Sequence, residues 1–389
     1  MTDYSALFDK GVERRGTGSY KWDSEPDVLP LWVADMDFAT APAVIEALER
    51  RVSQGAFGYT LVGEDYYRAV IDWFGRRHGW QIERGSIMYT SGVVPAISAI
   101  IKALAEPGDK VIVQTPVYNC FFSSIRNNGC TVLENPLIYT GDSYLIDFDD
   151  LAAKAADPKA KILLLCNPAN PAGRVWSRDE LLRIAGICRD NDVIVVSDEI
   201  HCELVYQGYK YTPYGTLPEE FVSRSVTCVS PSKAFNTAGL QIASIITPND
   251  SYRRRIDRAI NINEVCDVNP FGVAGTIAAY NHGEEWLSQL IAYLHANYEY
   301  MAAYCREHLP SLPICRLEGT YLVWMNIEAL GIAAAALEEY LLKEERLWLN
   351  AGDMYGDPHF IRWNIACPRS RLGEALARFS LAIDKMTDK

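Results

Sequence analysis

Lys233, within the sequence Ser230-Pro231-Ser232-Lys233, is the residue whose type and position point most directly to chemistry. Most lysines are solvated surface residues, but this one follows an apolar, β-prone stretch at residues 225–229. The carboxyl ends of strands in open α/β sheets are where ligands bind. An amine that is partly desolvated there can have its pKa lowered enough to form a Schiff base with a carbonyl compound. Taken alone, a strand-end lysine that reaches solvent is the favoured interpretation.

Two more polar side chains follow apolar stretches in the same way. Asn170 stands in the run Asn167 to Pro171, after residues 161–166, and Asp198 follows residues 192–197. Asn-Pro repeats usually mark turns, and an aspartate after a strand is often a helix N-cap. The ends of parallel strands converge on one crevice, however, so three such coincidences on successive strands favour a shared site.

A phosphate site and an aromatic face complete the set. Gly92 precedes Val93, Val94 and a helical stretch at residues 96–104. A glycine turn that opens a helix presents free N–H groups and the positive end of a dipole to an anion, although any helix start has these groups. Tyr118 follows another predicted strand and can stack on a planar ring, and a core tyrosine is the ordinary alternative.

Together, these groups predict a site for pyridoxal 5'-phosphate. Lys233 would hold the aldehyde and act as the base at the substrate α-carbon, while Asp198 would keep the pyridine nitrogen protonated. Asn170 would donate a hydrogen bond to the ring hydroxyl. The phosphate would be held by backbone N–H groups and hydroxyls, those of Val93, Val94, Ser230 and Ser232.

A candidate for the substrate carboxylate lies far along the chain. Arg362, in Phe360-Ile361-Arg362-Trp363, can bind a carboxylate with two parallel hydrogen bonds. A surface arginine on a strand is an equally good interpretation of the sequence. No cysteine spacing suggests a metal site, so we expect no metal.

The elements that would position these residues follow a βαβ rhythm. Strands are predicted at residues 110–114, 161–166, 192–197, 225–229 and 243–247, with a helix at 178–189 capped by Ser177. This alternation predicts an α/β protein with a mostly parallel sheet flanked by helices. A long helix at 284–308, strands at 321–327 and 360–364, and helices at 333–343 and from 371 predict a smaller α+β domain. The predicted division is a large domain over 46–284 and a small domain over 1–45 and 285–389.

Composition narrows the class of protein. The 389 residues carry 37 Lys plus Arg against 50 Asp plus Glu, and the net charge of −13 argues against nucleic-acid or anionic-membrane partners. We expect neither a secretory signal nor a membrane span. The ten cysteines show no disulfide framework, which favours the reducing cytoplasm.

The chain resembles fold-type I pyridoxal-phosphate enzymes of the class I/II aminotransferase superfamily over nearly its whole length. More narrowly, it resembles the MalY/PatB-type cystathionine β-lyases, which are carbon–sulfur lyases. The residues that carry the resemblance are Lys21-Trp22-Asp23, Trp32 to Phe38, Gly92 to Pro95, Asp198 to His201, Ser232 to Asn236 and Ala366 to Arg369. The strings Ala34-Asp35-Met36-Asp37-Phe38 and Ala366-Cys367-Pro368-Arg369 are the ones typical of that subgroup.

The resemblance implies a homodimer in which Tyr59 reaches the cofactor phosphate of the neighbouring subunit. It also places His201 beside the cofactor, and Ala34, Asp35 and Met36 beside the substrate with Arg362. Ala169 stands where the subgroup commonly has histidine, and Ala351 stands where we expect proline. Both positions are expected near the crevice, where they bear on the choice of substrate.

The expected reaction is β-elimination from L-cystathionine or a related cysteine S-conjugate, which yields a thiol, pyruvate and ammonia. Gln241 occupies the position, eight residues after the lysine, at which aspartate aminotransferases carry a basic residue, and this favours the lyase subgroup. The alternative within the same cofactor class is an aminotransferase acting on an amino acid and a 2-keto acid. A regulatory protein with a vestigial site is a third possibility, against which the intact set of Lys233, Asp198, Asn170 and Arg362 argues.

Overall fold

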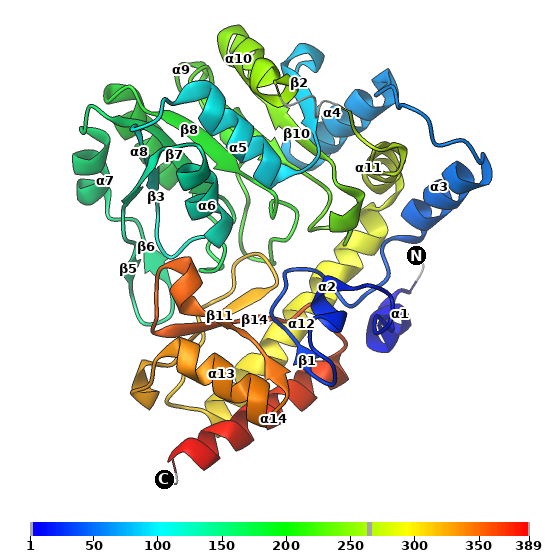
Figure 1. Ribbon diagram of the computed structural model, residues 1–389, viewed down its shortest axis with the longest axis vertical. Helices are drawn as coiled ribbons and strands as arrows, with labels where there is room; N and C mark the ends of the chain where they lie inside the picture. Colours follow the sequence, from blue (N-terminus) through cyan, green and yellow to red (C-terminus); the bar gives the residue numbers. More distant parts are fainter. Residues whose placement is uncertain (1–2, 263–266, 388–389) are drawn as a thin grey trace.

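The computed structural model describes residues 3–262 and 267–387. Its centre is a seven-stranded sheet in the order β2-β10-β9-β8-β7-β3-β4 (Figure 1). The strands are β2 (Ile87–Thr90), β3 (Lys110–Val113), β4 (Thr131–Glu134), β7 (Ala160–Cys166), β8 (Ile194–Asp198), β9 (Ser225–Val229) and β10 (Ala243–Ile246). Strand β10 alone runs in the direction opposite to the other six strands of this sheet. The predicted α/β fold with a mostly parallel sheet is therefore confirmed.

The central strands are apolar throughout because both faces of the sheet are covered. Successive side chains of a strand point to opposite faces, and β7 shows the consequence. Ile162 and Leu164 pack with α5 (Val93–Leu104), α6 (Asn119–Asn127) and α10 (Asp250–Asn261). Leu163 and Leu165 pack on the opposite side with α7 (Phe148–Ala155) and α8 (Arg178–Asp190).

Local signals explain where the helices begin. Ser177 caps α8 through its hydroxyl, and Glu180 returns the hydrogen bond to the Ser177 backbone, so the predicted cap is confirmed as a full capping box. Helix α5 begins at Val93, three residues before the predicted start. Pro95 lies in the first turn, where a missing N–H costs no intrahelical hydrogen bond.

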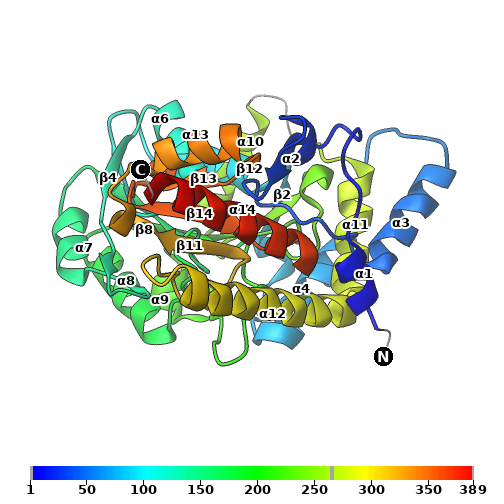
Figure 2. The same cartoon turned by 90° about the horizontal axis from the view of Figure 1, so that it is seen from below.

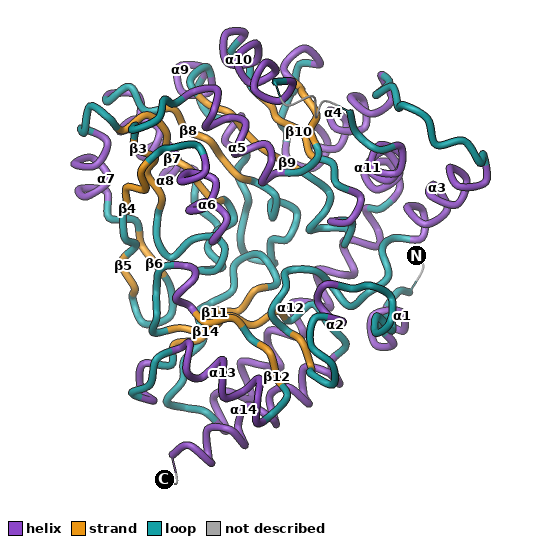
Figure 3. The backbone as a smooth tube through the Cα atoms, viewed as in Figure 1, coloured by secondary structure: helices purple, strands orange, loops and turns teal. Residues whose placement is uncertain are grey.

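The C-terminal part contains a second, three-stranded sheet in the order β11-β14-β13. It consists of β11 (Leu322–Asn326), β14 (Phe360–Asn364) and β13 (Asn350–Ala351), with α13 (Ala334–Glu344) and α14 (Arg369–Thr387) alongside. Helix α12 (Glu284–His308) has the predicted bounds and lies beside α14 below this sheet (Figure 2). Figure 3 shows that loops occupy much of the region between the two sheets.

The N-terminal residues join the C-terminal part, since β1 (Leu29–Pro30) pairs in parallel with β12 (Leu347–Trp348). Helix α3 (Pro42–Ser53) instead packs against α11 (Pro270–His282), so the predicted boundary at residue 46 falls inside a helix. The division into two domains stays a prediction. The remaining helices and strands are α1 (Ser5–Lys10), α2 (Tyr20–Asp23), α4 (Glu64–His78), α9 (Glu219–Val222), β5 (Ile138–Tyr139) and β6 (Tyr144–Leu145), with short 3-10 turns at Arg84–Ser86, Tyr214–Thr216, Ala238–Leu240, Glu328–Leu330 and Gly352–Tyr355.

The described residues provide neither a membrane-spanning helix nor a metal-binding cluster. Over 3–262 and 267–387, none of the helices combines the length and the apolar character that crossing a bilayer requires. The same residues contain no group of three or more histidine, cysteine, aspartate or glutamate side chains placed to hold a metal ion.

A buried ion cluster fixes the N-terminal segment. Lys21 is 1% exposed, and its Nζ lies 3.0 Å from Oδ1 of Asp37, which is also 1% exposed. Trp22 donates its indole N–H to the same oxygen at 2.8 Å, and Arg14 and Arg371 lie 3.6 and 3.4 Å from this carboxylate. A buried charge is tolerated when it is paired and hydrogen-bonded, and Asp37 is the carboxylate that all three of these cations contact.

We expect Asp37→Ala to lower the free energy of unfolding by about 3–5 kcal/mol, because it leaves the buried Lys21 with only its longer contacts to Asp35, at 3.4 and 3.7 Å. Urea denaturation of the two proteins measures the difference. Glu46→Ala is the matched control, since its ion pair with Arg50 is 4.0 Å long and exposed, and its loss should cost less than about 1 kcal/mol. Equal losses in the two variants would contradict the central place given to Asp37.

Candidate active site

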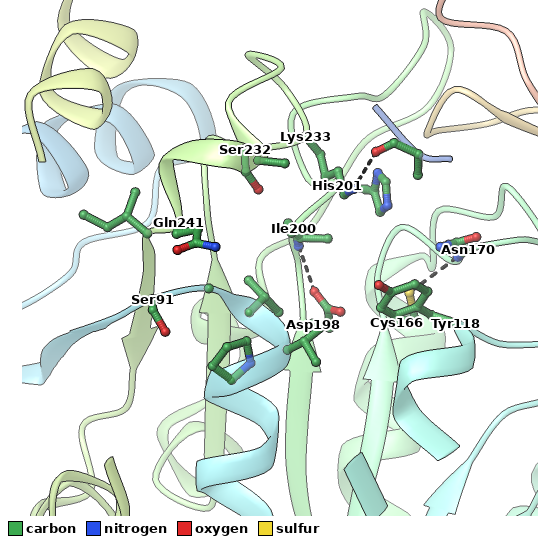
Figure 4. Close-up of a pocket in the computed structure, with 17 residues that line it drawn as sticks. Ser91, Tyr118, Cys166, Asn170, Asp198, Ile200, His201, Ser232, Lys233 and Gln241 are labelled. Atoms are coloured by element: carbon green, nitrogen blue, oxygen red, sulfur yellow. Dashed lines mark hydrogen bonds between the residues drawn. The ribbon is translucent and has the colours of Figure 1, made fainter. Parts of the chain in front are cut away.

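One cavity lies at the carboxyl ends of β7, β8 and β9 and at the start of α5 (Figure 4). It brings together most of the side chains singled out from the sequence, because parallel strands end at the same edge of a sheet. The residues that line it are Ala34, Ser91, Gly92, Val93, Val94, Pro95, Tyr118, Cys166, Asn170, Asp198, Ile200, His201, Ser232, Lys233, Ala238, Gln241 and Ile242.

Lys233 is held in this cavity by a backbone carbonyl. It lies in the turn after β9, and its Nζ donates to the carbonyl oxygen of Ala34 at 2.6 Å. Burial disfavours the ammonium form and lowers the pKa of the amine from 10.5 to about 8, although the nearby carboxylate of Asp35 opposes the shift. The amine is therefore more available as a nucleophile and base than that of an exposed lysine.

Asp198 closes the floor of the cavity at the end of β8. The residue is 3% exposed, and its Oδ1 accepts a hydrogen bond from the backbone N–H of Ile200 at 3.1 Å. Burial raises its pKa to about 7, and the amine of Lys233 acts against this shift. A cationic ring nitrogen at this carboxylate would restore the missing charge partner.

Arg362 and Asn170 meet across the two sheets. Arg362, on β14, is 3% exposed and donates from Nη1 to Oδ1 of Asn170 at 3.2 Å and from Nη2 to the carbonyl of Trp32 at 2.7 Å. Its Nε is buried without a hydrogen-bond partner, and the guanidinium lies 4.6 Å from the centre of the Tyr355 ring. Because Oδ1 of Asn170 accepts from Arg362, the amide nitrogen of Asn170 is the group left to donate to a ligand.

The start of α5 forms the other end of the cavity. Gly92 has a φ of 153°, a conformation open mainly to glycine, and it leads directly into the free N–H groups at Val93 and Val94. Ser91, Ser232 and Gln241 line the same end. Ser230 lies beneath, where its hydroxyl donates to the carbonyl of Ile242 at 2.7 Å and accepts from the N–H of Ser232 at 3.2 Å. Direct contact of Ser230 with a phosphate stays a prediction.

His201 and Tyr118 complete the walls. His201 is 3% exposed and its Nδ1 is buried without a partner. Burial lowers its pKa well below 6.5, and the cations Lys233 and Arg362 act in the same direction, so the imidazole is neutral. Burial raises the pKa of Tyr118, which keeps its hydroxyl protonated.

Besides Arg362 and Ser230, three further predicted residues are not among those that line the cavity. Tyr59 is 99% exposed, as a residue that reaches another subunit would be. Asp35 pairs with Arg14 at 2.8 Å, and Met36 is fully buried, so that of the segment 34–36 only Ala34 lines the cavity. Their contact with ligands stays a prediction.

The two unusual alanines were expected near the crevice, but both pack into apolar clusters. Ala169 is 4% exposed and lies among the side chains between the main sheet and α8. Ala351 is 5% exposed on β13, opposite Ile361. Neither is among the residues that line the cavity in the described part of the chain.

Several residues of the site were missed by sequence reasoning. Asn236, Tyr321 and Asn364 donate hydrogen bonds to the segment that covers Lys233. Asn236 belongs to a motif noticed in the sequence, but its partners lie about 200 positions away. A contact of that range leaves no local pattern. Cys166, at the end of β7, and Ile200, in the turn after β8, also line the cavity.

The donor set fits pyridoxal 5'-phosphate. Lys233, with its lowered pKa, would hold the aldehyde, the buried carboxylate of Asp198 would pair with the ring nitrogen, and the glycine-opened helix start would hold the phosphate. The partnerless Nδ1 of His201 and Nε of Arg362 indicate that the cavity is built for a polar molecule.

Comparison with known proteins agrees with this geometry. The model of the family "Aminotransferase class I and II" matches residues 26–379. The chain is 41% identical to cystathionine beta-lyase PatB of Bacillus subtilis, over 97% of this chain and 99% of that protein. It is 34% identical to protein MalY of Escherichia coli, over 97% of this chain and 98% of that protein.

A solved structure shows the same fold. Cystalysin from Treponema denticola, which contains a pyridoxal 5'-phosphate cofactor, superposes with a TM-score of 0.94 at 33% identity, over 97% of this chain and 98% of that one. Both the sequence and the structural matches thus extend over nearly the full chain. The protein belongs to the aminotransferase class I and II family and, within it, to the group of the MalY and PatB proteins.

Proposed function

We propose that the protein is a pyridoxal 5'-phosphate-dependent carbon–sulfur β-lyase that cleaves L-cystathionine or related cysteine S-conjugates. The observation that carries the proposal is the Lys233 amine, which is partly buried, has a lowered pKa and lines a cavity whose floor is the buried Asp198. The relative PatB, at 41% identity, is named a cystathionine beta-lyase. An amino-acid substrate fits both the family and the arginine at the cavity edge.

The chain's own groups would hold the cofactor at three points. When bound, pyridoxal phosphate withdraws electrons from the substrate α-carbon and so weakens its bond to hydrogen. The Asp198 carboxylate would accept a hydrogen bond from the protonated ring nitrogen, and the Asn170 amide would donate to the ring hydroxyl. Ser91, Ser232 and the N–H groups at the start of α5 would hold the phosphate.

The remaining steps follow from two residues. Arg362 would bind the substrate carboxylate through two parallel hydrogen bonds and so fix the direction of the α-hydrogen. Lys233, as the free amine, would remove that proton. The C–S bond electrons then leave with sulfur as a thiolate. The remaining three-carbon enamine takes up water outside the enzyme and gives pyruvate and ammonia.

We further propose that the active unit is a cytoplasmic homodimer. Support for the dimer comes from Tyr59, whose full exposure suits a side chain that reaches the phosphate of a partner subunit. Leu61, at 90% exposed, and Phe57, at 58%, lie in the same loop. The cysteines in the described ranges are all free, which suits a reducing compartment.

The reaction class is tested by incubating the protein with L-cystathionine in the absence of any 2-keto acid. We expect pyruvate and free thiol in equal amounts, measured by a coupled dehydrogenase and a thiol-reactive dye. Lys233→Ala should lower turnover by at least about 10²-fold, since it removes the base. Amino transfer to an added 2-keto acid, with neither pyruvate nor thiol formed in its absence, would establish the aminotransferase instead.

Arg362→Lys tests the carboxylate site. A lysine keeps the charge but loses the planar fork, so we expect kcat/KM to fall by about 10- to 100-fold. Steady-state kinetics with one S-conjugate gives the value, and thermal melting checks the fold. Arg50→Lys, at a helix position whose side chain is 71% exposed, is the control and should be neutral. Unchanged kinetics in Arg362→Lys would remove Arg362 from the substrate site.

Tyr59→Phe tests the contribution of the second subunit. The variant should stay dimeric by sedimentation and bind pyridoxal phosphate about tenfold more weakly, because one hydrogen bond to a charged group is lost. Equilibrium dialysis against the cofactor measures this affinity. Tyr20→Phe, at another exposed tyrosine, serves as the control. A monomeric wild-type protein with full activity would refute the shared site.

A further inference from the structure

The segment at residues 32–38, here called the strap, lies between the two sheets and has no helix or strand of its own. Its backbone oxygens accept hydrogen bonds from both of the residues assigned to the reaction. The Trp32 carbonyl accepts from Arg362 Nη2 at 2.7 Å, and the Ala34 carbonyl accepts from Lys233 Nζ at 2.6 Å. The strap thus connects the proposed carboxylate-binding group and the proposed base.

Asn236 joins the strap to the turn that carries Lys233. Its Oδ1 accepts from the Met36 N–H at 2.9 Å, and its Nδ2 donates to the carbonyls of Met36 at 3.0 Å and Phe38 at 2.8 Å. The residue has a φ of 53°, which asparagine tolerates better than most residues. All three of these bonds bind one short stretch of the strap to a residue three positions after the lysine.

Residues of the smaller sheet and of the segment before it also donate hydrogen bonds to the strap. Asn364, on β14, donates from Nδ2 to the carbonyls of Val33 at 2.5 Å and Asp35 at 2.6 Å. Tyr321 donates its hydroxyl to the Ala34 carbonyl itself at 3.0 Å. Asn364 therefore holds the 33–34 and 35–36 peptide groups, which flank the 34–35 peptide, and together with Tyr321 they fix the direction of the Ala34 carbonyl.

We propose that the strap positions Lys233 for proton transfer: the Ala34 carbonyl holds the amine whenever the amine is not attached to the cofactor, and Asn236 and Asn364 are positioning residues that aim this carbonyl. The inference rests on the proposed function, in which Lys233 is the base. A carbonyl that accepts one N–H from a neutral amine leaves the lone pair free and fixes its direction. The lysine side chain has a flexible four-carbon stem, so the amine can adopt many positions. A fixed hydrogen-bond acceptor limits these positions and so limits the directions in which the nitrogen lone pair can point.

The alternative is that the strap has only a structural role, in which it covers the cavity and does not position the Lys233 amine. Asn236→Gly separates the two, because glycine keeps a φ of 53° without strain while all three side-chain bonds are lost. The matched control is Asp192→Gly, which removes a side chain at a φ of 60° in a loop where the carboxylate is 85% exposed. Both variants replace a polar residue of positive φ by glycine, but only Asn236→Gly removes hydrogen bonds to the strap.

The first readout is the reactivity of Lys233 in the full-length protein freed of cofactor. Competitive acetylation across pH, with the Lys233 peptide quantified by mass spectrometry, gives the titration midpoint of the amine. We expect Asn236→Gly to lower this midpoint by about one pH unit, because the displaced carbonyl no longer stabilises the protonated amine. Asp192→Gly should keep the wild-type midpoint.

The second readout is the split between kcat and KM in the holoenzyme. Asn236→Gly should lower kcat by about 10- to 100-fold and leave KM within about twofold, since it misplaces the base but not the substrate. If Asn236→Gly lowers only the melting temperature and keeps both the wild-type midpoint and kcat, the strap is structural and the inference is wrong.

A second variant, Tyr321→Phe, acts on the same carbonyl without touching Asn236 and serves if Asn236→Gly does not fold. It removes the competing donor, so the Lys233 midpoint should rise by a few tenths of a pH unit. An unchanged midpoint would overturn the inference. Wild-type protein that forms no thiol from any S-conjugate would overturn the proposed function, whereas the acetylation experiment would still test the strap.

Discussion

Buried backbone groups must be hydrogen-bonded, and this constraint shapes the whole region between the two sheets. The strap passes through it without regular structure, so strand or helix bonds cannot satisfy its carbonyls. Side chains take the place of those bonds: Asn236 donates from the turn after β9 of the main sheet, and Asn364 and Arg362 donate from β14 of the smaller sheet. Each of these hydrogen bonds stabilises the strap. Because the donors come from both sheets, the bonds also connect the two sheets through the strap. The candidate active site lies beside the strap, where these hydrogen bonds are concentrated.

The electrostatics of the cavity follow from the same burial. Burial moves the pKa of Asp198 upward and that of Lys233 downward, so each group loses part of its charge near neutral pH. Such opposed shifts are typical of sites that await a charged ligand. A ring with a protonated nitrogen and an aldehyde would satisfy both groups at once, which is why these residues fit the cofactor.

Sequence reasoning predicted the parts of the site that depend on local order. Lys233, Asp198 and Asn170 were found because each follows an apolar strand, and the parallel sheet then brings strand ends together. The same reasoning could not find Asn364, whose partners lie more than 300 positions away, or assign a role to Asn236. It also expected Ala169 near the crevice; this residue directly precedes Asn170, which lines the cavity, but its own side chain packs in an apolar cluster. Side-chain direction and long-range pairing are properties of the packed structure, and no short window of sequence contains them.

The sheet and the lysine are common to lyases and aminotransferases, so the outcome depends on the β-carbon substituent. A thiol has a reference pKa of about 8.5, and its anion is a good leaving group near neutral pH. Elimination of a thiolate therefore needs removal of the α-proton but little help from an acid at sulfur. The walls of the cavity agree with this requirement. His201 is held neutral by burial and by two neighbouring cations, and burial raises the pKa of Tyr118. A site that offers a well-placed base and weakly acidic walls favours substrates that carry their own good leaving group, and cysteine S-conjugates are such substrates.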